Sequence, residues 1–409
     1  MKKILLMMVI MPVLLFAKEY NLPDMIEIGM QNSHQILSQQ QELQNAKSSL
    51  RNNYWEILPS ANLNASNNRY DNNAWTKSAG FSISKSIYLN EPTYFNIRRG
   101  LLNKENAEYT WQDTRKQIAY NIVSYYLTIL ESKKALQIQQ KNIELQKKIK
   151  NQIEIMYEVG KKSELELQQS EIDLIDYEIA VLEAKNSLKT SRKELFNYLN
   201  IEDDGWELKE PDMPEYKLVE DFKTNLEITR QQNNIKSTKL SLFEQKLNFL
   251  PSFSLGYSYN YDKPTIADYN DWDDYEDSTT LSLSFSYSLF DLFHKYENHG
   301  QQKRNLKIQQ IALDRTQKKY QTELENLNSD IATLEKSVKL YEKKITLARK
   351  NLEKAEEQFK LGLINLLDLD KSRLDYLNAQ LNYNKNYYQL FRKQEERNLL
   401  LSQKILGRW

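Results

Sequence analysis

The sequence predicts a mainly α-helical fold that is built as a tandem repeat and carries four β-strands per chain. Glycine and proline number only 9 and 8 in 409 residues, well below ordinary usages of roughly 7% and 5%, which favours long unbroken helices. A helical hairpin occurs twice, with Gly160 and Gly362 at its turns, an offset of 202 positions. Four further segments alternate apolar and small polar residues with the period of a strand.

The first 17 residues have the pattern of a secretory signal peptide. Lys2 and Lys3 precede an apolar run over 4–16, and Ala17 comes before the charged pair Lys18-Glu19. The run is too short to span a bilayer. The chain has no cysteine, so we expect an exported protein without disulfides, without a thiolate metal site and without the cysteine of a bacterial lipid anchor.

The chain after the signal peptide is predicted to consist of two repeats, at 18–201 and 225–409, joined by a polar linker at 202–224. Each repeat has the same order: a helix, a β-hairpin, a long helix, a glycine turn and a return helix. In the first repeat we expect these elements at 22–57, about 61–89, 94–158, Gly160 and up to about 200. In the second we expect them at 221–250, about 252–290, 296–358, Gly362 and beyond.

Two details support the duplication. Gly160 is the only glycine between Gly100 and Gly205, and Gly362 is the only one between Gly300 and Gly407, so each is the natural site for a left-handed turn. The return helices also share an apolar face of the kind that packs on a partner. At the offset of 202 positions, this face aligns Leu165, Ile172, Ile175 and Ile179 with Leu367, Leu374, Leu377 and Leu381.

The predicted strands have the length and alternation of tilted membrane strands, about ten residues each. We expect one face to contact lipid, with Phe253, Leu255, Leu283 and Phe285, and serines such as Ser254, Ser282 and Ser284 to lie on the other. Four strands cannot close a barrel, and an open edge in lipid would leave backbone groups unpaired. Two, three or four copies would supply 8, 12 or 16 strands, and a conduit needs more than two copies. The alternative is a soluble hairpin packed on the helices.

The ordered set of motifs resembles the TolC-type outer membrane efflux proteins. It includes Leu58-Pro59-Ser60, its repeat Leu250-Pro251-Ser252, and Asn225-Leu226-Glu227-Ile228 at the start of the second half. The resemblance implies a homotrimer whose 12-stranded barrel in the outer membrane continues as a helical tunnel across the periplasm. It implies the exit duct of a tripartite efflux pump or type I secretion system, with a periplasmic adaptor and an inner-membrane pump as partners. The turns would face the adaptor, through Val159, Gly160, Lys161, Leu361, Gly362 and Leu363.

The resemblance also implies an acidic ring at the periplasmic entrance, six and nine residues after the second turn glycine. Asp368 occupies the first position, while Lys371 occupies the second and the extra acid is Asp370. Three Asp368 carboxylates around an axis would hold cations at the constriction. The alternative is that Asp368 caps or solvates the return helix. For Glu166, at the equivalent position of the first repeat, a solvated helix face is the favoured interpretation.

Other functional classes find little support. His34, His294 and His299 lack metal-ligand spacing, no nucleophile or phosphate-loop motif occurs, and we expect neither a cofactor nor catalysis. Lys+Arg and Asp+Glu both number 56, so nucleic acid is not an expected partner. The acidic stretch 268–277 lacks the glycine and glutamate of a calcium loop, which favours a solvated loop. The remaining alternative to a channel is a periplasmic coiled-coil scaffold or adhesin without a pore.

Overall fold

The computed structural model describes residues 19–69, 75–88, 91–205, 207–211, 225–262, 276–287 and 289–409. The predicted signal peptide and most of the acidic stretch 268–277 lie outside these residues. The chain divides into two compact units, one from 1–36, 115–221 and 323–409 and the other from 37–114 and 222–322. Each unit therefore contains segments from both halves of the sequence.

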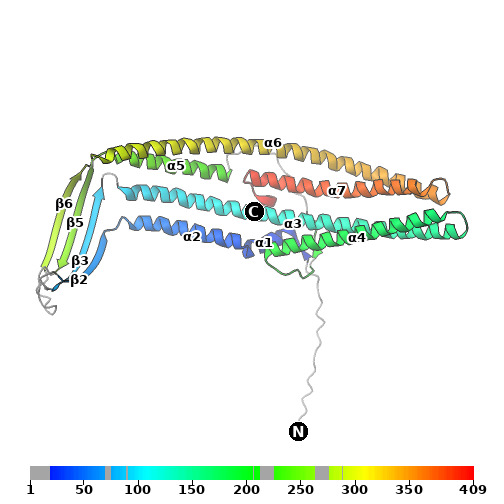
Figure 1. Ribbon diagram of the computed structural model, residues 1–409, viewed down its shortest axis with the longest axis horizontal. Coiled ribbons are helices and arrows are strands. Elements are labelled where there is room, and N and C mark those ends of the chain that lie inside the picture. The colour runs from blue at the N-terminus through cyan, green and yellow to red at the C-terminus, as the bar shows by residue number, and fades with distance from the viewer. Residues whose placement is uncertain are drawn as a thin grey trace, which may run out of the picture. The chain divides into compact units, whose positions relative to one another are not determined.

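Seven α-helices make up most of the described residues (Figure 1). They are α1 (Leu22–Asn32), α2 (His34–Trp55), α3 (Pro92–Glu158), α4 (Glu164–Leu199), α5 (Leu226–Leu247), α6 (Asp291–Lys360) and α7 (Leu366–Leu400). A 3₁₀ turn, η3 (Ile405–Gly407), follows α7. No helix among the described residues is both long and apolar enough to cross a membrane.

The prediction of one helix over 22–57 is wrong, because Ser33 separates α1 from α2 with an extended ψ of 117°. Helix α1 begins with a capping box in which Asn21 and Asp24 each accept the other's backbone N–H. The long helices begin earlier than predicted, at Pro92 and Asp291. Proline is well tolerated in a first turn, where its missing N–H has no helical partner to lose.

The second unit contains an antiparallel four-stranded sheet in the order β2-β3-β5-β6 (Figure 1). The strands are β2 (Ser60–Arg69), β3 (Trp75–Tyr88), β5 (Ser252–Asp262) and β6 (Glu276–Ser286). Phe253 pairs with Phe285 and Leu255 with Leu283, so the apolar residues share one face as the alternation predicted. Strands β2 and β6 form the two edges of this sheet.

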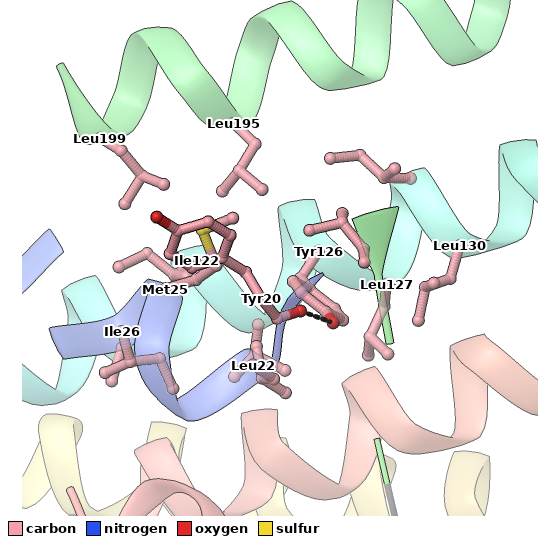
Figure 2. Close-up of a cluster of buried hydrophobic side chains, with 14 of the residues drawn as sticks. Tyr20, Leu22, Met25, Ile26, Ile122, Tyr126, Leu127, Leu130, Leu195 and Leu199 are labelled. Carbon is pink, nitrogen blue, oxygen red and sulfur yellow. Dashed lines mark hydrogen bonds between the residues drawn. The ribbon is translucent and has the colours of Figure 1, made fainter. Parts of the chain in front are cut away.

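The first unit is held by an apolar core on α1, α3, α4 and α7. Figure 2 shows Met25 of α1 beside Ile122 of α3, with Leu195 and Leu199 of α4 above them. A short parallel pair, β1 (Glu19–Tyr20) and β4 (Glu207–Leu208), lies beside this core. The hydroxyl of Tyr126 donates to the carbonyls of Tyr20 at 3.2 Å and Lys209 at 2.5 Å, which ties the two strands to α3.

Candidate functional site

The two interhelical turns of the first unit have the same backbone geometry. Gly160 and Gly362 have φ of +74° and +75°, the left-handed conformation that the sequence predicted. At each turn the amide after the glycine donates to the carbonyl five residues earlier, Lys161 to Met156 at 2.8 Å and Leu363 to Gln358 at 2.9 Å. This is the Schellman arrangement that ends many helices. The apolar side chains of Val159, Leu361 and Leu363 are exposed at these turns.

The return helices begin with different caps. Ser163 caps α4 in a capping box with Glu166, whose carboxylate also accepts from Lys162 at 2.7 Å. The hydrogen bond from Lys162 holds the pKa of Glu166 below its ordinary value. Asn365 caps α7 by accepting the backbone N–H of Asp368 at 2.9 Å. Asp368 is therefore not the cap. It is exposed in the first turn of α7, where the helix dipole stabilises its negative charge.

An apolar cluster joins the two helical hairpins just behind the turns. It consists of Ile149 and Ile153 from α3, Leu352, Ala355 and Phe359 from α6, and Leu366 and Leu369 from α7. The ammonium of Lys162 lies 5.1 Å from the centroid of the Phe359 ring, a cation–π contact between the first turn and α6. Phe359, the aromatic residue three positions before Gly362, is therefore held in place by packing.

Arg373 of α7 is the most deeply buried charge in this region, with 1% of its side chain exposed. Its guanidinium donates to Asp370 on the same helix and to the side-chain oxygen of Gln146 on α3. It also lies 5.0 Å from the centroid of the Tyr177 ring on α4. Gln146 in turn donates to the carbonyl of Ser170 at 3.2 Å. Arg373 therefore contacts α3 and α4 at once.

Asp370 lies between α7 and α4, where it meets a second carboxyl, Asp173. Burial raises the pKa of Asp370 to about 6, the neighbouring carboxyl of Asp173 contributes in the same direction, and Arg373 opposes the shift. Both acids line a cavity of about 720 Å³ between the two helices. Its lining also includes Glu166, Asp176 and Tyr177.

The sequence-predicted acids therefore occupy different environments. Asp368 is exposed near the turn, whereas Asp370 is bound to Arg373 and faces α4. Sequence reasoning missed Arg373, Gln146 and Asp173. One signal was available, because the buried face of α7 is Leu366, Leu369, Arg373 and Leu377. At that spacing Arg373 is a charge within an apolar stripe, which indicates a buried partner.

The apolar face shared by the two return helices is largely exposed in a single chain. Leu165, Ile172, Ile175 and Ile179 of α4 are exposed, as are Leu367 and Leu374 of α7. Of the eight paired positions, only Leu377 is fully buried. The packing partner predicted for this face is therefore absent from the chain's own described residues. Exposed apolar stripes of this kind mark interaction surfaces.

The sheet is also uncovered on both faces in the described residues. Phe253, Leu255, Leu283 and Phe285 are exposed, and so is every residue of β6. Phe253 and Phe285 pack on each other with ring centroids 5.1 Å apart. An exposed apolar sheet face in water would be an aggregation liability, so this face needs a covering medium.

In the part of the chain that the structure describes, no group of three or more His, Cys, Asp or Glu side chains is placed to hold a metal ion. The possible calcium loop at 268–277 falls mostly outside the described residues.

Comparison with known proteins identifies this architecture. The sequence profile of the outer membrane efflux protein family matches residues 26–200 and 225–401. None of the curated proteins compared matches the sequence. Among solved structures, the outer membrane protein VceC from Vibrio cholerae is similar with a TM-score of 0.79 at 14% identity, over 94% of this chain and 96% of that one.

Two further channel structures have the same fold. The Campylobacter jejuni CmeC outer membrane channel gives a TM-score of 0.77 at 17% identity, covering 93% of this chain and 85% of that one. The open state of the Neisseria gonorrhoeae MtrE outer membrane channel gives 0.79 at 13% identity, covering 94% and 89%. Since the family profile matches most of the sequence, the chain belongs to the outer membrane efflux protein family.

Proposed function

We propose that this outer membrane efflux channel is the exit duct of a tripartite efflux pump or type I secretion system, and that it is a passive conduit that extends into the periplasm. The observation that carries the proposal is the sheet, which has two open edges and two uncovered faces. An open edge in lipid costs several kcal/mol per unpaired backbone group. A pore-free scaffold or adhesin has no use for such a sheet.

Closure of the sheet requires further copies of the chain. In the simplest arrangement β6 of one chain pairs with β2 of the next, and three chains give a barrel of 12 strands. The exposed apolar stripes of α4 and α7 supply a second surface for contacts between copies.

We expect the detergent-purified protein to have the mass of three mature chains, because paired edges remove the unpaired backbone groups. Native mass spectrometry after chemical cross-linking measures this number. A stable monomer with a folded sheet would contradict the proposed closure, and a dimer would leave little lumen.

The turns are the proposed contact with a periplasmic adaptor, which then connects to an inner-membrane pump. Leu361 and Leu363 flank Gly362 and are exposed, so they offer apolar contacts to a helical partner. We expect the double variant Leu361→Asp, Leu363→Asp to lower export in cells at least tenfold, because two charges without water would face the partner. Conductance of the purified channel should stay unchanged. Equal export by the double variant and the wild type would contradict docking at this turn.

Asp368 is proposed as the cation-binding acid of the entrance. Asp370, the second acid predicted for the constriction, is instead bound to Arg373 and faces α4. Asp368 is exposed in the first turn of α7, where three copies around an axis would converge. We expect Asp368→Asn to weaken block of conductance by divalent cations by about tenfold, because the ring would lose its charge. Glu166→Gln, at the equivalent position of α4, is the matched control. A larger effect from the Glu166 variant would place the constriction elsewhere.

A further inference from the structure

Two carboxyls from different helices meet in the cavity between α4 and α7. Asp370 of α7 is bound to the buried guanidinium of Arg373, and Asp173 of α4 lies against Asp370. The Oδ2 atom of Asp173 and the Nε atom of Arg373 are buried and have no hydrogen-bond partner among the described residues. The Oδ1 atom of Asp173 accepts from Gln169 at 2.9 Å. One oxygen of Asp173 therefore still lacks a donor.

The charges of this group do not balance when both acids are ionised. Arg373 supplies one positive charge, and it is the one basic side chain among the described residues that line the cavity. Two ionised carboxylates in one cavity repel each other, and neither can donate a hydrogen bond to the other. A single proton removes the repulsion and supplies a hydrogen bond from one acid to the other. That bond would join α7 to α4.

We propose that Asp370, Asp173 and Arg373 form a proton-operated latch, which holds α7 against α4 behind the second turn when one proton is shared and loosens when that proton leaves. The bond that breaks is the hydrogen bond between the two carboxyls, and the proton passes to water at the cavity mouth. Arg373 keeps its contacts to Gln146 and Tyr177 in both states. The latch acts on the position of α7 relative to α4.

The surroundings do not supply a competing charge partner. Helix α4 contributes Glu166, Asp176 and Tyr177 to the cavity, all acidic or neutral, and α3 contributes the neutral Gln139. The residues of α6 in the neighbouring cluster, Leu352, Ala355 and Phe359, are apolar. Lys162, which precedes α4, is already paired with Glu166. Loss of the proton therefore leaves the two carboxylates to repel each other between α7 and α4.

The direction of the response follows from the pKa of Asp370, which burial and Asp173 raise from 3.8 to about 6. A raised pKa means that the folded state favours the protonated acid. The latch is then fully closed below about pH 4 and opens as the pH rises through about 6. If the chain is the proposed duct, this movement widens the entrance behind Gly362. That consequence rests on the proposed function, whereas the latch itself rests on the geometry.

The test is a distance measurement between spin labels on α4 and α7 in the full-length protein. Because the chain has no cysteine, Gln168→Cys and Asn378→Cys give one label on each helix, both at exposed positions outside the apolar stripes. Labelled chains are diluted with unlabelled chains, so that each pair lies within one chain. Pulsed electron–electron double resonance then records the distribution of distances between the two labels from about pH 4 to pH 8.

We expect a narrow distribution in acid that becomes broader and longer with a midpoint near pH 6. Asp370→Asn keeps a donor toward Asp173 without titrating, so the distribution should stay narrow at every pH. Asp173→Asn removes the repelling charge, so the midpoint should fall below the wild-type value. Asp368→Asn, on the exposed side of the same turn of α7, is the control and should keep the wild-type midpoint.

A wild-type distance that does not change with pH overturns the latch, and so does a wild-type midpoint in both Asp370→Asn and Asp173→Asn. The result is separable from the proposed function, because the labels report helix positions and not ion flow. A protein that conducts ions but shows no pH-dependent distance lacks the latch. A protein that shows the pH-dependent distance but never conducts has the latch without being a channel.

Discussion

Arg373→Met is expected to lower the free energy of unfolding by roughly 3 to 5 kcal/mol at about pH 8, because it leaves buried acids without their cation. Arg373 is 1% exposed, and its removal also breaks the hydrogen bond to Gln146 and the ring contact with Tyr177. Methionine has a similar length and is apolar, so the loss reports the missing charge more than a missing volume.

The loss should be smaller at about pH 5, because Asp370 then binds a proton and the uncompensated charge disappears. Thermal unfolding in detergent at both pH values measures the difference. Arg349→Met is the matched control, since Arg349 forms an exposed pair with Glu353 on α6. An exposed pair contributes only about 0 to 1 kcal/mol. An equally small effect at Arg373 would mean that the buried contacts of its guanidinium do not stabilise the helices.

Leu283→Arg is expected to cost roughly 2 to 4 kcal/mol in lipid if this position lies near the bilayer centre, since an arginine there has no partner for its charge. Leu283 is 78% exposed in the single chain and pairs with Leu255 on the apolar face of the sheet. Ser284→Arg, one residue along the same strand, places the same side chain on the opposite face, where a water-filled lumen would solvate it.

Reversible folding into lipid vesicles with urea as denaturant measures both variants. The comparison uses one strand, one substituted residue type and neighbouring positions, so differences in strand propensity largely cancel. If the two variants lose the same free energy, the proposed assignment of faces to lipid and lumen is contradicted.

Local chemistry made much of the fold predictable. The repeated glycine between two helical segments indicated a turn, and both Gly160 and Gly362 have the left-handed φ that this implies. Alternation over about ten residues fixed which side chains share a sheet face, and the pairing of Phe253 with Phe285 follows it. Element ends were less predictable, because Ser33 breaks a helix that its neighbours would continue.

The polar node behind the second turn could not be derived from sequence, because it depends on three helices meeting. Gln146 and Asp173 lie 227 and 200 positions before Arg373 in the chain, and the three residues share no local pattern. The spacing of Asp370 and Arg373 indicates an ion pair on one helix. It does not show that this pair is buried against a second carboxyl on α4; burial first, and Asp173 with it, raises the pKa of Asp370.

The central claim, that this chain forms a continuous conduit, is tested most directly by single-channel conductance in planar lipid bilayers. The purified full-length protein is added to one side, and current is recorded at a fixed voltage. We expect discrete, uniform current steps, because closed barrels of one size insert one at a time. A protein that associates with the bilayer and has a folded sheet, yet gives no current steps, would contradict the account and favour a scaffold without a pore.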